Sequence, residues 1–156
     1  MRRTFLLPFL IVFSIVPVSP ASAGDLHAAL ERRSATAHTV ADLLERGKEI
    51  KFEGATSKIA EASKPFLEEL AAALVKEPSV RLEIISHTSS SGAAPKDMAL
   101  SKRRAEAVKH LLVGKGVSAD RVVATGRGSE DPIAPNITRS GRMRNERVEL
   151  HRAGPR

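Results

Sequence analysis

The stretch from Leu82 to Ala107 constrains the fold most, because a strand, a polar loop and an amphipathic helix follow one another directly. Apolar and charged side chains alternate along the strand. Val80, Leu82 and Ile84 point to one face, and Arg81 and Glu83 point to the other. The next residues, 87–92, carry no apolar group larger than the Thr88 methyl. After Pro95 a helical period brings a set of residues to one face: Ser101, Ala105, Val108 and Leu112. The N–H groups of such a loop and helix start converge, which suits a polar ligand.

The rest of the chain repeats this alternation of strands and helices. Apolar alternation predicts four strands: Glu49 to Glu53, Val80 to Ser86, Arg121 to Thr125 and Glu146 to Arg152. Helical spacing predicts long helices from Ala60 to Lys76, regular from about Lys64, and from about Lys96 to Val113, with a short turn near Thr138 to Arg142. Long helices between strands require crossovers, so part of the sheet is parallel. The expected fold is α+β, in the order β-α-β-α-β-β, with a mixed four-stranded sheet and both long helices on one face.

The first 23 residues are predicted to be a cleaved secretory signal peptide. Arg2 and Arg3 precede an apolar stretch, and Ala21-Ser22-Ala23 offers small residues for cleavage. An uncleaved N-terminal anchor is the alternative. No second apolar stretch follows, so the mature chain is expected to be exported without a transmembrane span. The chain has no cysteine, which excludes a disulfide and a cysteine-linked lipid.

The 156 residues suffice for one domain with short flanking segments. Residues 24–46 are predicted to be a helical linker or an N-terminal helix, because their apolar residues have helical spacing. One folded domain is expected over residues 47–152, followed by a tail at residues 153–156.

The chain is basic. Its formal charge is +7, and loss of Arg2 and Arg3 with the acid-free leader leaves +5. This charge suits anionic partners such as cell-wall polymer, anionic lipid or nucleic acid. The chain has no Trp or Tyr to stack on unpaired bases. A carboxylate-rich partner is therefore favoured, and nucleic acid is not expected.

Two blocks of residues carry a family resemblance. The first is His87-Thr88-x-x-x-Gly92 followed by Leu100-Ser101-x-x-Arg104-Ala105-x-x-Val108. It resembles the central motif of OmpA-like peptidoglycan-binding domains. The second is similar to that family's later motif: Gly126-x-Gly128-x-Glu130-x-Pro132-Ile133-Ala134-x-Asn136-x-Thr138, then Gly141-Arg142-x-x-Asn145-x-Arg147-Val148-Glu149. The resemblance runs from about Ile50 to Leu150, roughly two thirds of the chain.

The resemblance implies non-covalent binding of the diaminopimelate-containing stem peptide of peptidoglycan. The family's arginine at the position of Arg104 binds a diaminopimelate carboxylate, and a guanidinium can hold a carboxylate with two parallel hydrogen bonds. From the residues alone, Arg104 could instead be a surface arginine paired with Glu106 or Asp97. Thr88 and Gly92 are expected to shape the ligand loop, and Thr88 to offer its N–H or hydroxyl.

The chain departs from the family at the position that binds the ligand's ammonium group. The family usually has Gly-His-Thr-Asp where this chain has Ser86-His87-Thr88-Ser89. A serine cannot balance a positive charge, which costs about 1–3 kcal/mol, or roughly ten- to a hundredfold in affinity. Asp97, where the family has asparagine, is expected either to supply the missing negative charge or to cap the helix.

A second departure lies where the family has two adjacent arginines and this chain has Glu146 and Arg147. One positive charge is reversed there. Arg147 is expected either to reach a second ligand carboxylate or to pair across the sheet with Glu83 or Glu149.

No catalytic, metal or cofactor site is predicted. His87 lies near Ser89, but no carboxylate is placed to orient the imidazole, and no G-x-S-x-G elbow exists. The five histidines lack metal-ligand spacing. Gly114-Lys115-Gly116 ends a helix rather than opening one, so it is not a phosphate loop.

The sequence therefore predicts a non-enzymatic periplasmic module of a Gram-negative bacterium. It would bind peptidoglycan and anchor or organise cell-envelope components, in association with the outer membrane or the cell wall. The expected ligand-binding residues are Thr88, Ser89, Gly92, Asp97, Arg104 and Arg147. The alternative is a degenerate OmpA-like domain that has lost peptidoglycan binding and acts as a protein-interaction module, with residues 24–46 facing the partner.

Overall fold

The computed structural model of the chain describes residues 39–90 and 92–154. The elements are, in chain order, α2 (Val40–Leu44), the 3-10 turns η1 (Gly47–Glu49) and η2 (Glu61–Ser63), α3 (Lys64–Lys76), β1 (Leu82–His87), α4 (Ala94–Gly114), the 3-10 turn η3 (Ala119–Arg121), β2 (Val122–Gly128), α5 (Arg139–Asn145) and β3 (Val148–Arg152). The predicted signal peptide, the linker before residue 39 and the end of the tail lie outside the described residues.

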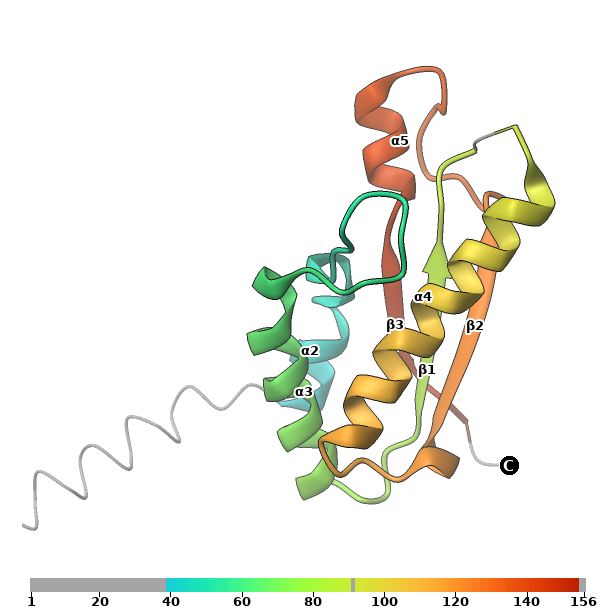
Figure 1. Ribbon diagram of the computed structural model, residues 1–156. Coiled ribbons are helices and arrows are strands. Elements are labelled where there is room, and N and C mark those ends of the chain that lie inside the picture. The colour runs from blue at the N-terminus through green and yellow to red at the C-terminus, as the bar shows by residue number, and fades with distance from the viewer. Residues whose placement is uncertain (1–38, 91, 155–156) are drawn as a thin grey trace, which may run out of the picture. The chain divides into compact units, whose positions relative to one another are not determined.

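The sheet is mixed, as expected. Among the described residues it has three strands in the order β2-β1-β3. β1 runs parallel to β2, with Leu82 opposite Val122, and antiparallel to β3, with Ile84 opposite Leu150. The parallel pair follows from α4, which connects β1 to β2 as a crossover (Figure 1).

The predicted strand from Glu49 to Glu53 does not form, so the prediction of a four-stranded sheet is wrong. Its backbone pairs with its own loop, where Phe52 and Ile59 form an isolated antiparallel bridge. The apolar alternation still indicated burial correctly, since Ile50 is only 1% exposed. A side chain can be buried beside a sheet without its backbone joining the ladder.

Both long helices lie on one face of the sheet, as predicted. α4 crosses β1 and β2, and α3 lies beside α4 (Figure 1). They cover the inward side chains of the strands, among them Leu82, Ile84 and Val122. The opposite face is more open, and Val123 there is 39% exposed. The hydrophobic core therefore lies between the sheet and the helices.

The end of the predicted linker belongs to this core. Val40 and Leu43 on α2 are fully buried, and α2 packs against α3 and β3. A reciprocal capping box between Thr39 and Asp42 fixes the start of this short helix. Residues 39–46 are thus part of the folded domain.

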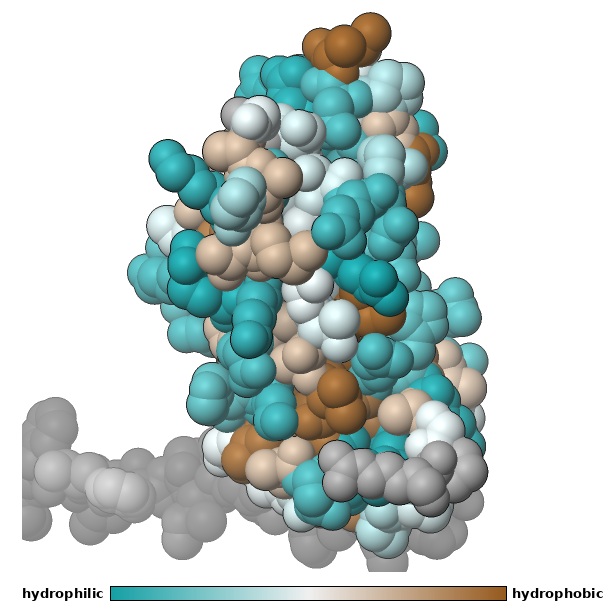
Figure 2. Space-filling model, turned by 90° about the vertical axis from the view of Figure 1, so that its right-hand side faces the viewer, coloured by the Kyte–Doolittle hydropathy of each residue, from teal (hydrophilic) through white to brown (hydrophobic). Residues whose placement is uncertain are grey.

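Figure 2 shows the side of the molecule on which β2 lies. Hydrophilic residues cover most of this face, and hydrophobic residues gather only in small areas. The described residues on this face therefore form no broad apolar patch.

Candidate functional site

The end of β1, the start of α4 and the loop after Phe52 border a pocket of about 310 Å³. Its lining residues come from four segments: Phe52, Gly54, Ala55, Thr88, Ser89, Asp97, Leu100, Arg104 and Glu146. Four of the six residues predicted to bind the ligand are among them, namely Thr88, Ser89, Asp97 and Arg104. The structure thus brings together the centre of the predicted site.

α4 carries two of these residues on its buried face. Asp97 and Arg104 are seven positions apart, which is two helical turns, and they are 4% and 3% exposed. Between them, the hydroxyl of Ser101 donates to Met98 O at 2.8 Å and accepts the N–H of Gly128 at 2.8 Å. This bond ties the polar face of α4 to the end of β2, so the helix cannot turn these side chains toward solvent.

Arg104 is buried, so its interpretation as a surface arginine is wrong. Its Nε donates to Thr56 O at 2.9 Å, and its Nη2 donates to Gly54 O at 2.7 Å. The Phe52 ring lies under the guanidinium, 4.9 Å from Cζ to the ring centroid. Burial lowers the pKa of Arg104, and the carboxylate of Glu146 opposes that shift. The guanidinium stays charged and is held in one orientation.

A carboxylate that was not predicted as a site residue reaches the same point. Glu146 Oε2 lies 3.8 Å from Arg104 Nη1, an ion pair too long for a hydrogen bond. The hydroxyl of Ser89 donates to Glu146 Oε1 at 2.8 Å. The Glu146 side chain is 44% exposed and therefore open to a ligand. Ser89 and Glu146 together place a negative charge on the wall of the pocket.

Asp97 does not cap α4, so that alternative is wrong. The N-cap is Ala93, which makes no side-chain hydrogen bond, and Asp97 lies in the first turn. The hydroxyl of Ser129 donates to Asp97 Oδ2 at 3.3 Å. The helix dipole favours a carboxylate in this turn.

The residues at the end of β1 are buried beneath the pocket. The Thr88 N–H donates to Gly128 O at 2.8 Å, and its hydroxyl has no hydrogen-bond partner among the described residues. His87 Nε2 lies 3.6 Å from Glu149 Oε1, which is beyond hydrogen-bonding distance. Burial lowers the pKa of His87. An orphaned buried hydroxyl costs about 1–3 kcal/mol, so a ligand that bonds Thr88 would recover part of that cost.

Two predicted residues lie outside the pocket. Gly92 adopts a φ of 83°, which suits a turn, and does not line the pocket. Arg147 donates to Glu149 Oε1 at 2.7 Å and to Asp131 O at 3.3 Å. Of its two predicted roles, the structure shows the pairing with Glu149. Arg147 lines a neighbouring groove.

Sequence reasoning missed one wall of the pocket and its acidic residue. The loop at Gly54 supplies a carbonyl that holds Arg104, and its run of small residues was the available signal. For Glu146 the signal was the reversed charge next to Arg147. That reversal could be linked to Ser89 only once the fold placed the two residues together.

The pocket combines one buried guanidinium, two carboxylates and two hydroxyl groups. The charged members are Arg104, Asp97 and Glu146, and the hydroxyls belong to Thr88 and Ser89. A ligand that carries a carboxylate beside an ammonium group would match both signs of charge. The described residues contain no group of three or more His, Cys, Asp or Glu placed to hold a metal ion.

Comparison with known proteins places this fold and site in a family. The model of the OmpA family matches residues 51–146, and the chain belongs to that family. It is 36% identical over 110 residues to outer membrane porin F of Pseudomonas fluorescens, a match that covers 70% of this chain and 34% of the porin. It is 35% identical over 104 residues to the peptidoglycan-binding protein ArfA of Mycobacterium tuberculosis, covering 67% of this chain and 32% of ArfA.

A solved structure supports the same assignment. The C-terminal domain of Helicobacter pylori MotB aligns with a TM-score of 0.60 and 27% identity, over 68% of this chain and 84% of that domain. Family membership confirms the α+β OmpA-like fold and the prediction of a non-enzymatic module. The match spans about a third of the length of porin F and of ArfA. No helix within residues 39–90 and 92–154 is long and apolar enough to cross a membrane.

Proposed function

We propose that this chain binds peptidoglycan non-covalently through the pocket around Arg104. The ligand would be the diaminopimelate-containing stem peptide, and the site of action the periplasm of a Gram-negative bacterium, at the cell wall or the outer membrane. There the chain would anchor or organise components of the cell envelope. The observation that carries the proposal is the buried guanidinium of Arg104 on the wall of an open, polar pocket. Membership of the OmpA family and the similarity to ArfA support it.

Arg104 is the clamp for a ligand carboxylate. Two of its nitrogens are bound to backbone carbonyls, which leaves Nη1 as the donor on the side of Glu146. A buried cation that lacks a closely bonded anion is costly, so a carboxylate at Nη1 would stabilise the site. The bonds to Gly54 and Thr56 fix the guanidinium beforehand, which lowers the entropy lost on binding.

Glu146 and Asp97 are the partners for the ligand's ammonium group. Ser89 cannot carry the charge of the family aspartate, but its hydroxyl holds the carboxylate of Glu146 at the same pocket. The negative charge is thereby moved from the loop after β1 to the residue that follows α5. A charge-assisted hydrogen bond is about twice as strong as a neutral one, so the ammonium group would bind the Glu146 carboxylate more strongly than the Ser89 hydroxyl.

The second candidate is a protein-interaction module that has kept the fold and lost the ligand. Its supporting observation is that the carboxylate of Glu146 approaches Arg104 from within the chain and could substitute for a ligand carboxylate. This alternative places the partner on residues 24–46. Val40 and Leu43 of that segment are buried in the core, which removes these apolar side chains from the partner surface.

Sedimentation with insoluble peptidoglycan tests the proposal. The purified chain should pellet with the polymer, and Arg104→Ala should lower its affinity at least tenfold because the carboxylate clamp is lost. Glu146→Gln should weaken binding by a similar factor. Ser89→Asp alone would place a second carboxylate next to Glu146, and the two would repel each other. The informative variant is therefore Ser89→Asp with Glu146→Arg. It restores the family residues at both positions and should keep binding.

Melting temperatures control for folding, since Arg104 also holds the loop at Gly54 and Thr56. Lys102→Ala, on the exposed side of α4, is the matched control and should bind as the wild type does. If the folded wild type stays in the supernatant while the double variant pellets, peptidoglycan binding has been lost and the interaction module is the better account.

A further inference from the structure

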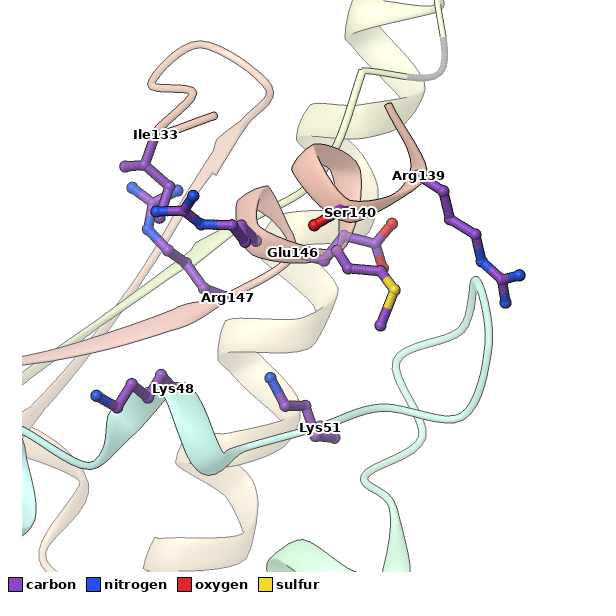
Figure 3. A pocket seen from close by; sticks show the side chains of 9 residues that line it. Lys48, Lys51, Ile133, Arg139, Ser140, Glu146 and Arg147 are labelled. Carbon is purple, nitrogen blue, oxygen red and sulfur yellow. The ribbon is translucent and has the colours of Figure 1, made fainter. Parts of the chain in front are cut away.

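A second, larger groove of about 950 Å³ lies beside the pocket. Five cationic side chains line it, and we call it the basic groove: Lys48, Lys51, Arg139, Arg144 and Arg147. Figure 3 shows Lys48 and Lys51 on one side of the groove and Arg139 and Arg147 on the other, where Glu146 lies between the two arginines. The two sides come from the segment at η1 and from α5 with the residue that precedes β3.

Most of these charges are not neutralised within the described part of the chain. Lys48, Lys51, Arg139 and Arg144 are exposed and have no carboxylate partner among the described residues. Arg147 is bound to Glu149, and Glu146 is the acid that lines the groove. Converging cations raise the local potential and attract anions. An ordinary solvated surface would intersperse such charges with acids.

The groove also presents apolar side chains. Ile133 is 54% exposed and Met143 is 66% exposed, and both line the groove. Apolar groups set among a few converging polar ones are typical of ligand sites. The combination fits a ligand that carries several anionic groups on a partly apolar chain.

The basic groove continues into the pocket around Arg104. Glu146 lines both. A small hollow of about 160 Å³ connects them, sharing Lys51 and Met143 with the groove and Phe52 and Arg104 with the pocket. A ligand held at Arg104 would therefore reach the groove without crossing another element.

We propose that the basic groove is a second subsite for the same stem peptide. One residue of the peptide binds at Arg104, and the groove holds further carboxylates of that peptide. This inference rests on the proposed function. The pocket selects the residue with a carboxylate and an ammonium group, and the groove adds affinity for the anionic remainder of the polymer. Because four of the five cations are exposed, their contribution is screened by salt, whereas that of the buried Arg104 is screened much less.

Two ligands separate the subsites. Free diaminopimelate fits the pocket alone, and insoluble peptidoglycan engages both. Lys48→Glu with Arg144→Glu reverses two charges that line only the groove, and Lys76→Glu with Lys102→Glu makes the same charge change elsewhere. The groove variant should lose about tenfold in affinity for peptidoglycan at low salt, show a weaker salt dependence and bind diaminopimelate unchanged. The control variant should resemble the wild type with both ligands.

The outcomes are distinguishable. Equal peptidoglycan affinity and salt dependence for the groove variant and the control would overturn the second subsite while leaving the pocket intact. Equal losses for both ligands at an unchanged melting temperature would also overturn it, because the two subsites would then not be separate. If the wild type binds neither ligand, the proposed function itself fails. If the wild type binds phosphatidylglycerol vesicles, and the groove variant loses this binding but keeps its affinity for peptidoglycan, the groove would be reassigned to lipid phosphates.

Discussion

Arg104 shows how much of the site a single residue's spacing could reveal. In the helical pattern Arg104 lies next to Ala105 on the predicted apolar face, and the structure buries its side chain there. The pattern could not show that the Gly54 and Thr56 carbonyls hold that guanidinium, because these partners are about fifty residues away in the chain. Nor could it pair Ser89 with Glu146, which are 57 positions apart. Local patterns predict which face a residue occupies, and long-range contacts require the fold.

Asn145 anchors the loop between β2 and α5. Its Oδ1 accepts the N–H groups of Ile133 and Ala134 at 2.9 and 3.0 Å. Its Nδ2 donates to Ala134 O at 2.8 Å and to Asn136 Oδ1 at 2.9 Å. The side chain is almost fully buried.

We expect Asn145→Ala to lower the free energy of unfolding by about 3 kcal/mol, because it orphans several polar groups at once. Urea denaturation measures this change. Ser140→Ala, an exposed residue on the same helix, should stay within about 0.5 kcal/mol of the wild type. A loss below about 1 kcal/mol for Asn145→Ala would mean that the loop is held by other contacts.

At the scale of elements, the contact between α4 and β2 sets the geometry of the pocket. They approach closely at Gly126, where an added Cβ would clash with Lys102 N and lie 2.7 Å from Lys102 Cα. Both atoms belong to helix backbone, which cannot move aside. The absence of a side chain at Gly126 therefore lets α4 lie near enough to β2 for Ser101 to reach Gly128.

Gly126→Ala should push α4 away from β2 and lower the free energy of unfolding by about 2 kcal/mol or more. Thermal unfolding and peptidoglycan sedimentation should both show the loss, since Asp97 and Arg104 move with the helix. Gly114→Ala is the matched control: no atom lies within 4 Å of its Cβ, and it ends α4, so it should be neutral or slightly stabilising. Similar unfolding temperatures for Gly126→Ala and the wild type would contradict this packing.

The elements themselves were predictable from the sequence, with one exception. α3 begins at Lys64 as Pro65 predicted, and the three observed strands lie within two or three residues of their predicted bounds. The expected strand from Glu49 to Glu53 failed because alternation reports which side chains are buried. It does not report which backbone supplies the hydrogen bonds, and here the loop around Ile59 supplies the bridge.

At the scale of the whole domain, one core stabilises every element around the site, and His87 lies at its edge. Burial lowers the pKa of His87 from its ordinary value of 6.5; Arg147 and Arg127 lower it further, whereas Glu149 and Asp131 raise it. Just below pH 6.5 the His87 imidazole is therefore protonated more readily in the unfolded chain than in the folded chain. The free energy of unfolding should fall as the pH drops from 6.5 through the folded pKa of His87, and level off for this group below it.

Urea denaturation of the wild type and of His87→Gln across this range checks the prediction. The variant should show a flatter pH dependence, whereas His110→Gln, an exposed residue on α4, should follow the wild type. Parallel curves for the wild type and His87→Gln would show that other groups govern acid sensitivity.

The central claim is that the pocket around Arg104 holds one end of a peptidoglycan stem peptide. An NMR titration of the ¹⁵N-labelled chain with a soluble stem peptide that contains diaminopimelate tests it most directly. We predict saturable shifts of the Arg104 Nε–H signal and of the Thr88 and Ser89 amide signals. In the Arg104→Ala variant the two amide signals should no longer shift. Spectra that do not change, or shifts confined to residues outside the pocket and the basic groove, would contradict the account.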